Sequence, residues 1–103
     1  MALYVLMKRR EYDIQITVNK RSIRKVVIDP HYEEKHSASV DDQVVLRLVK
    51  QLDGRLFEPD AAQPPYTYFV TDDMVLGEKR YKLIWLLEDD ALYVGIVNAY
   101  RRK

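Results

Sequence analysis

The chain lacks cysteine, has only three glycines and two histidines among 103 residues, and contains no long apolar run. Without cysteine, disulfides and thiolate metal sites are excluded, which fits an intracellular protein. A phosphate-cradling loop is not expected, because glycines are few and no P-loop, dinucleotide-binding turn or nucleophile elbow is present. No segment is long enough to span a membrane, and the start MALYVLMKRR is too short and wrongly ordered for a signal peptide. We therefore expect a cytoplasmic protein without membrane contacts.

The residues that are present suit one globular domain over residues 1–103, with 48% hydrophobic and 32% charged residues. The net charge of +1 is unevenly distributed. Residues 1–36 carry eight Lys or Arg against five Asp or Glu, residues 37–78 carry three against eight, and residues 79–103 carry six against three. The two basic end segments would attract a polyanion if the fold brought them together. Solvated strand faces would give the same pattern.

Residues 29–54 hold the helix signals and both histidines. Asp29 followed by Pro30 is typical of an N-cap and a first helical turn, because proline lacks only an N–H that would be unbonded there. Acidic residues follow, and Lys35 and His36 suit the negative end of the helix dipole. The pattern predicts a short polar helix that reaches His36.

A second, amphipathic helix is predicted directly afterwards. Ser39 with Asp42 three residues later resembles a helix start, and Gly54 is typical of a C-terminal stop. Between them lies an apolar stripe at helical spacing. It consists of Val44, Val45, Leu48, Val49 and Leu52.

Six segments read as strands, from their alternation or their apolar content. They are residues 2–8, 11–18, 22–28, 66–71, 79–88 and 91–101. Residues 55–65 are expected to form an irregular surface connection, residues 72–77 a turn or short hairpin arm, and Asp89 with Asp90 a hairpin turn. The predicted fold class is α+β: a single antiparallel β-sheet with two N-terminal-half helices packed on one face, in the order β-β-β-α-α-β-β-β.

His31, Lys35 and His36 form the first group of candidate functional residues. His31 and Lys35 are four residues apart, so on a helix they project from the same side. An imidazole exchanges protons near neutral pH, and a lysine can hold a phosphate. The alternative is that both histidines only cap turns. A metal site of His31, His36 and a carboxylate is disfavoured, because a five-residue separation fits one helix face poorly. No metal or cofactor is expected.

The second group lies on the last two predicted strands. Arg80 and Lys82 share one strand face, Asn98 and Tyr100 share one face of the final strand with its apolar residues, and Arg101 lies on the opposite face. An asparagine in that apolar pattern marks a site or pairs with a backbone group. Tyrosines interleaved with Arg and Lys would suit base stacking and phosphate contacts. The alternative is that the tyrosines are half-buried sheet residues with hydroxyls at the rim.

These features together resemble the small toxin ribonucleases of the barnase–EndoU–colicin–RelE group. The shared order is a strand, a short His/Lys helix, an amphipathic helix, an antiparallel meander rich in Arg and Tyr, and a basic C-terminus. The segment HYEEKH and the strand pair KRYKLIWLLEDDALYVGIVNAYRRK are similar to the BrnT-like and contact-dependent-inhibition toxin members. The resemblance spans residues 28–103, and residues 1–27 add an N-terminal strand region that the smallest members lack.

The resemblance implies metal-independent RNA cleavage, in which a ribose 2′-OH attacks the adjacent phosphate. This reaction needs a base for the 2′-OH, an acid for the leaving oxygen and cations for the phosphorane. The candidate catalytic residues are His31, Lys35, His36 and Tyr100, and the candidate substrate-binding residues are Arg80, Lys82, Asn98 and Arg101. The implied partners are RNA and a protein antitoxin or immunity partner.

A second hypothesis remains open beside the ribonuclease. The acidic middle segment would suit docking to a basic partner, which favours a non-enzymatic interaction module. Such a module would be antitoxin-like, immunity-like or a small regulatory binding protein. Convergence of His31 with Arg80, Asn98 and Arg101 in one cleft would favour the enzyme, and dispersal over opposite faces would favour the module.

Overall fold

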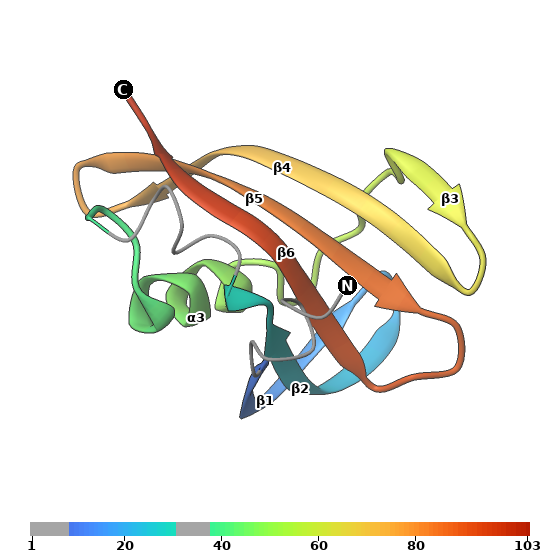
Figure 1. Ribbon diagram of the computed structural model, residues 1–103. Coiled ribbons are helices and arrows are strands. Elements are labelled where there is room, and N and C mark those ends of the chain that lie inside the picture. The colour runs from blue at the N-terminus through green and yellow to red at the C-terminus, as the bar shows by residue number, and fades with distance from the viewer. Residues whose placement is uncertain (1–8, 31–37) are drawn as a thin grey trace, which may run out of the picture.

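The computed structural model describes residues 9–30 and 38–103, and its six strands form one sheet (Figure 1). The elements are β1 (Arg10–Val18), β2 (Arg21–Ile28), α3 (Asp42–Lys50), β3 (Ala61–Gln63), β4 (Tyr66–Leu76), β5 (Lys79–Glu88) and β6 (Tyr93–Arg102). The strand order across the sheet is β1-β2-β6-β5-β4-β3.

The sheet is mixed, so the expectation of a single antiparallel sheet is wrong. Neighbouring strands are antiparallel except β2 and β6, which pair in parallel over Lys25–Ile28 and Tyr93–Ile96. The physical reason is the connection: β2 reaches the rest of the sheet through α3 and the β3–β5 meander rather than through a tight turn. A long crossover of this kind permits parallel pairing, whereas a hairpin does not.

The expected pair of helices is also corrected. Residues 9–30 and 38–103 contain one α-helix, the nine-residue α3, which packs on one face of the sheet. The predicted strand at residues 2–8 and residues 31–36 of the predicted short helix lie outside the described residues. No helix in the described part of the chain is long and apolar enough to cross a membrane.

Helix α3 carries the expected apolar stripe but begins later than Ser39. Asp41 is the N-cap, in extended conformation, and its carboxylate accepts a hydrogen bond of 2.9 Å from the Val44 amide. The predicted start was wrong because Asp41 can cap the helix immediately before the stripe. Gly54 follows the helix with φ of +76°, as expected for a stop, and its N–H donates to the Thr17 carbonyl. The buried residues of the stripe are Val45, Leu48, Val49 and Leu52.

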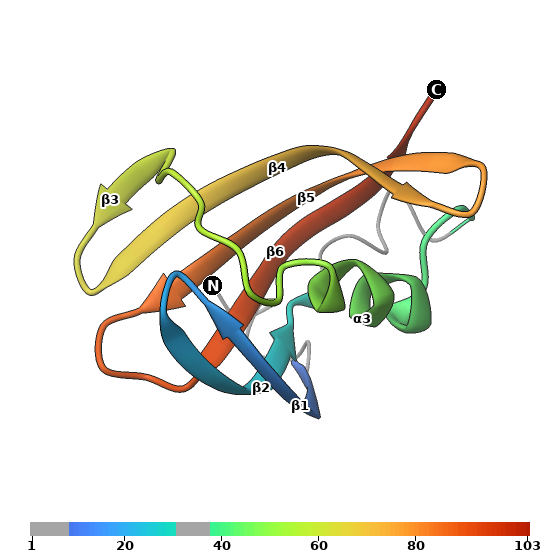
Figure 2. The same cartoon turned by 180° about the vertical axis from the view of Figure 1, so that it is seen from behind.

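We call the sheet face that packs on α3 the inner face and the opposite face the outer face. In Figures 1 and 2, α3 and the β1–β2 hairpin lie on the same side of the long strands β4, β5 and β6. Trp85 is at the centre of the core and is fully buried. Its ring stacks on Phe69 at 4.1 Å between centroids, and its indole N–H donates to the Thr71 hydroxyl. The alternation predicted for residues 79–88 is confirmed, with Tyr81, Leu83, Trp85 and Leu87 on the inner face.

Two bulges interrupt the long strands. In β4 the pairing with β5 shifts between Thr71 and Met74, and Asp73 has φ of +53°. The strand therefore continues through residues 72–76, which were expected to form a turn or separate arm, and the turn is at residues 77–78. In β6 the pairing with β5 shifts so that Val97 is an extra residue. A bulge changes which face the following residues occupy.

Candidate functional site

The bulge at Val97 determines which side chains gather on the outer face. Asn98 pairs with Ile84 and Tyr100 with Lys82, whereas Ile96 pairs with the buried Trp85. The expectation that Asn98 and Tyr100 share a face with Val94 and Ile96 is therefore wrong. The extra residue moves Asn98 and Tyr100 to the outer face, and Ala99 becomes buried instead. Nothing in the sequence marks this bulge, because valine suits either sheet face.

The register brings Arg80, Lys82, Asn98 and Tyr100 together on the outer face. The Lys82 ammonium lies 5.8 Å from the centroid of the Tyr100 ring, within the range of a cation–π contact. The Asn98 side-chain oxygen accepts a hydrogen bond of 2.9 Å from the Ala99 amide. The alternative that Asn98 pairs with a backbone group is thus confirmed. Its side-chain nitrogen remains the group that would donate to a ligand.

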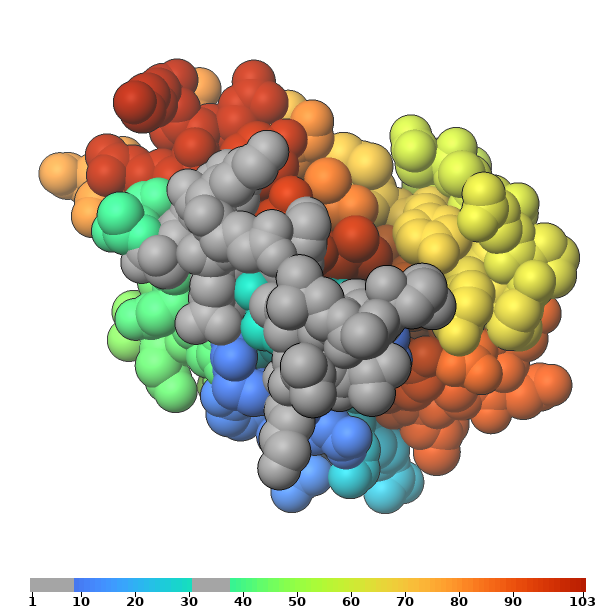
Figure 3. All heavy atoms as spheres, viewed as in Figure 1, coloured from blue at the N-terminus to red at the C-terminus, as the bar shows by residue number. Residues whose placement is uncertain are grey.

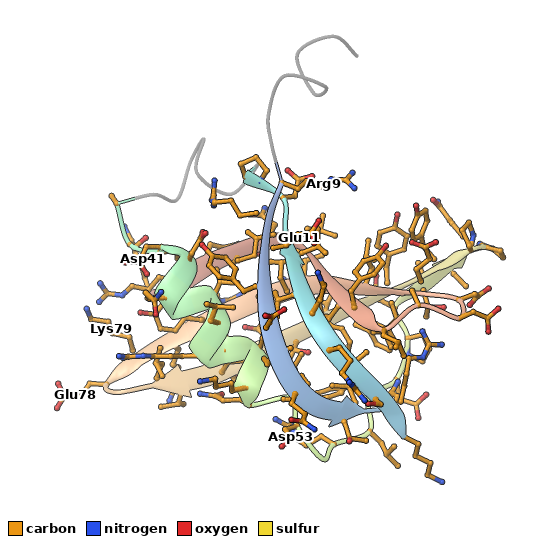
Figure 4. The ribbon with its side chains drawn as sticks, turned by 90° about the horizontal axis from the view of Figure 1, so that it is seen from below. Arg9, Glu11, Asp41, Asp53, Glu78 and Lys79 are labelled. Carbon is orange, nitrogen blue, oxygen red and sulfur yellow. The ribbon has the colours of Figure 1, made fainter. Side chains whose placement is uncertain are left out.

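Arg101 does not join this group, because it pairs with Tyr81 on the inner-face side of β6. It belongs instead to a basic corner formed where β5 begins and β6 ends. The corner consists of Lys79, Arg80, Arg101, Arg102 and Lys103, which with Glu78 line a depression of about 290 Å³. Figure 4 shows Glu78 and Lys79 at the tip of the β4–β5 hairpin, and in Figure 3, viewed as in Figure 1, the C-terminal residues lie in red at the upper left.

Acidic side chains partly neutralise the basic corner. Arg102 forms an ion pair of 3.2 Å with Asp72, and Arg80 lies 3.9 Å from Asp73. Both pairs are well exposed, so each contributes little to stability and a polyanion can compete for the arginines. The β4 bulge supplies both aspartates, and their effect on the corner could not be predicted from an expected turn at residues 72–77.

His31, Lys35 and His36 lie outside the described residues. The structure therefore brings together four of the eight predicted site residues on the outer face and places Arg101 at the adjacent corner.

A pocket at the other end of the outer face was not predicted. It has a volume of about 240 Å³ and lies between β2, β6, β5 and β4. Its wall includes three tyrosines, Tyr66, Tyr68 and Tyr93, and we call it the tyrosine pocket. The remaining lining residues are Arg9, Val27, Asp29, Leu86, Gly95, Ile96 and Val97. The sequence signal for it is Gly95 within an apolar strand, which indicates a close approach of another group.

Tyr93 is held in place by Glu88, whose carboxylate accepts a hydrogen bond from the Tyr93 hydroxyl. Burial, together with this bond and the negative charge of Glu88, raises the pKa of Tyr93 above its ordinary value. The hydroxyl thus tethers the Tyr93 ring to Glu88 at the wall of the pocket.

A third cluster joins α3 to β1. The Asp42 carboxylate accepts hydrogen bonds from Arg10 at Nε (2.6 Å) and at an Nη atom (2.9 Å), and from the Tyr12 hydroxyl. The bond to Asp42 is the main cause that raises the pKa of Tyr12 above its ordinary value. Arg10 also pairs with Ile28 across the β1–β2 ladder. The cluster thus fixes the start of α3 against the strand end that leads to residues 29–30.

The described residues offer no built cation site: within residues 9–30 and 38–103, no three His, Asp or Glu side chains are placed to hold a metal ion. The outer face combines rings, cations and an amide, a chemistry that suits phosphates and planar bases. Comparison of the chain with protein-family models, with curated proteins and with solved structures finds no match.

Proposed function

We propose that this domain binds single-stranded RNA across the outer face of its sheet and cleaves it as a toxin-like, metal-independent endoribonuclease in the cytoplasm. The observation that supports the proposal is the β5–β6 register, with Arg80, Lys82, Asn98 and Tyr100 on one face. On such a face the cations neutralise phosphates, and the aromatic ring beside them stacks on a base.

The dimensions of the face suit a single strand. The basic corner and the tyrosine pocket lie toward opposite ends of β5, at Arg80 and Leu86. Six residues of extended chain span roughly 20 Å. A few nucleotides cover such a length, consistent with the small end of the range of roughly 4–16 nucleotides per domain in single-strand-binding proteins.

Cleavage would use groups from both candidate sets. Lys82 and Arg80 would hold the scissile phosphate, and Tyr100, in contact with Lys82, would position it or donate a proton to the leaving oxygen. His31 or His36 would act as base or acid, with Lys35 as a further phosphate contact. In this proposal an antitoxin or immunity protein would neutralise the enzyme by covering the same face.

Binding and cleavage can be measured separately. Binding is tested with a labelled single-stranded oligoribonucleotide, comparing wild type with Lys82→Ala and with Lys50→Ala, a matched loss of charge on α3. Lys82→Ala should weaken binding and reduce the slope of log K against log salt by about 0.7 for the phosphate contact that it removes. Lys50→Ala should change neither. Equal effects of the two variants would reject the outer face as the RNA site.

Cleavage is tested with the same RNA in the presence of a chelator. Wild type should release a product with a 2′,3′-cyclic phosphate, and the His31→Ala/His36→Ala double variant should not. Induction of both in bacteria, with growth and total RNA integrity followed, extends the test to cells. RNA that is bound but left intact would reject the ribonuclease and retain the binding function.

A non-enzymatic interaction module is the second candidate, and a specific observation favours it. Val70 and Val75 on β4 are exposed by 40% and 54%, and Val75 pairs with Arg80, which forms an ion pair with Asp73. Exposed valines flanked by balanced charges also suit a protein partner. A chain that neither binds nor cleaves RNA would favour this module over the ribonuclease.

A further inference from the structure

The tyrosine pocket is built on one residue row that crosses four strands of the outer face, beginning with Val27 of β2, which pairs with Gly95 of β6. Gly95 of β6 pairs with Leu86 of β5, and Leu86 pairs with Tyr68 of β4. Tyr66 and Tyr93 lie two residues further along their strands, beside Glu88. Leu86 is thus the apolar centre of the pocket, between aromatic side chains supplied by β4 and β6.

Gly95 makes room for Leu86. A Cβ atom at this position would lie 2.8 Å from Cδ1 of Leu86 and 3.0 Å from its Cγ, so Leu86 occupies the space that a side chain would need. The same Cβ would lie 3.5 Å from the Tyr93 ring. Any larger residue at Gly95 must displace Leu86 and change the shape of the pocket.

The walls have a defined arrangement. The Tyr66 and Tyr68 rings lie 6.4 Å apart with an angle of 57° between them. The Tyr93 ring is tethered through its hydroxyl to Glu88. A tethered ring such as Tyr93 loses little conformational freedom on binding, which favours affinity for a planar ligand.

The size and charge of the pocket indicate which kind of ligand it can hold. A volume of about 240 Å³ is below the roughly 300–1,000 Å³ of sites for drug-sized ligands, so the pocket suits one small ring system. Arg9 and Asp29 both line it. Their opposite charges favour a neutral ligand with polar edges over a free anion or cation.

From this geometry we infer that the tyrosine pocket holds one base of the bound RNA strand, stacked against tyrosine, while the phosphates run toward Lys82 and the basic corner. The inference rests on the proposed RNA-binding function and adds to it a subsite at one position of the strand. The base would contact the pocket about 20 Å from Arg80. Such a subsite adds one position of the strand at which the affinity depends on a base held by the tyrosine pocket.

The test uses a single-stranded 2′-O-methyl oligoribonucleotide of about eight nucleotides, which cannot undergo 2′-OH attack. The same strand is prepared with an abasic residue at each position in turn, and dissociation constants are measured at one salt concentration. In wild type, the abasic residue should weaken binding at one position by about 5- to 150-fold, the range for loss of one stacked base.

Variants of the pocket complete the test. Tyr68→Ala should bind the intact strand more weakly by a similar factor, and its dissociation constant should no longer depend on the abasic residue. Tyr68→Phe keeps the ring and should behave as wild type. Gly95→Ala, which displaces Leu86, should also reduce the sensitivity. Thermal unfolding verifies that each variant is folded.

The outcomes separate the two proposals. Two results would overturn the base subsite but not RNA binding. In the first, the intact strand binds and no abasic position weakens binding; in the second, the effects of Tyr68→Ala and of the abasic residue are fully additive. Absence of wild-type binding to every strand would overturn both.

Discussion

Replacing Asp42 with alanine should destabilise the fold far more than replacing its neighbour Asp41. Asp42 receives two charge-assisted hydrogen bonds from Arg10 and one from Tyr12, across 30 or more residues of sequence. Asp41 makes a local cap to Val44. The two substitutions remove the same charge from adjacent positions, so their difference measures the contact between α3 and β1.

The expected loss in free energy of unfolding follows from how deeply the Asp42–Arg10 ion pair is buried. Removing one partner of a fully buried ion pair costs about 3–5 kcal/mol. The Asp42 and Arg10 side chains are 15% and 34% exposed, so water can partly solvate the guanidinium that is left behind. We therefore expect Asp42→Ala to lower the free energy of unfolding by about 2–3 kcal/mol. Asp41→Ala should lower it by about 1 kcal/mol, the usual cost of losing an N-cap.

Urea unfolding followed by Trp85 fluorescence and by circular dichroism would measure both values. With a slope of about 1–3 kcal/mol per molar for small proteins, Asp42→Ala should lower the midpoint by roughly 1–2 M. The unfolding temperature should fall by about 10–20 °C. Tyr12→Phe, which removes the hydrogen bond from the Tyr12 hydroxyl to Asp42, should cost about 1 kcal/mol.

A cost for Asp42→Ala no larger than that for Asp41→Ala would refute the reasoning. A double-mutant cycle with Arg10→Met supplies a second check, because groups that touch should show a coupling of about 0.5–3 kcal/mol. Additive effects would mean that the bidentate contact does not stabilise the helix against the sheet.

The remaining predictions concern β6. Because the pKa of Tyr93 is raised in the fold, its contribution to stability is complete below its unfolded value of about 10 and is lost as the pH rises further. Urea unfolding at about pH 9 and pH 11 should therefore show a smaller loss for Tyr93→Phe than for wild type, and an equal loss would contradict a raised pKa of Tyr93 in the folded protein. Deleting Val97 should remove the bulge and leave Asn98 and Tyr100 on the outer face, because Asn98 would then follow the inward Ile96 in regular alternation. The deletion should therefore cost less than the roughly 3 kcal/mol expected when polar side chains are turned into the core, and a larger cost in urea unfolding would contradict this register. Val97→Ala keeps the bulge and is the control in the same assay.

The sequence by itself determined the local elements. The period-two alternation of residues 79–88 predicted which residues of β5 are buried, because one strand face must leave water. The stripe at Val45, Leu48, Val49 and Leu52 predicted the buried side of α3 for the same reason. The turn at Asp89 and Asp90 was also predicted correctly from the sequence. These features depend on neighbours a few residues apart, and such neighbours are visible in a linear pattern.

Only the tertiary structure decided how the elements combine into a candidate site. The parallel β2–β6 pairing joins residues far apart in the chain, and no local signal specifies it. The Val97 bulge places Asn98 and Tyr100 on the face opposite to the expected one. The residue type gives no signal of the bulge, because valine is common on both faces of a sheet. The tyrosine pocket needs four strands in register around Gly95. The sequence thus supplied the residue types on the outer face, and the register of the strands determined which of them meet.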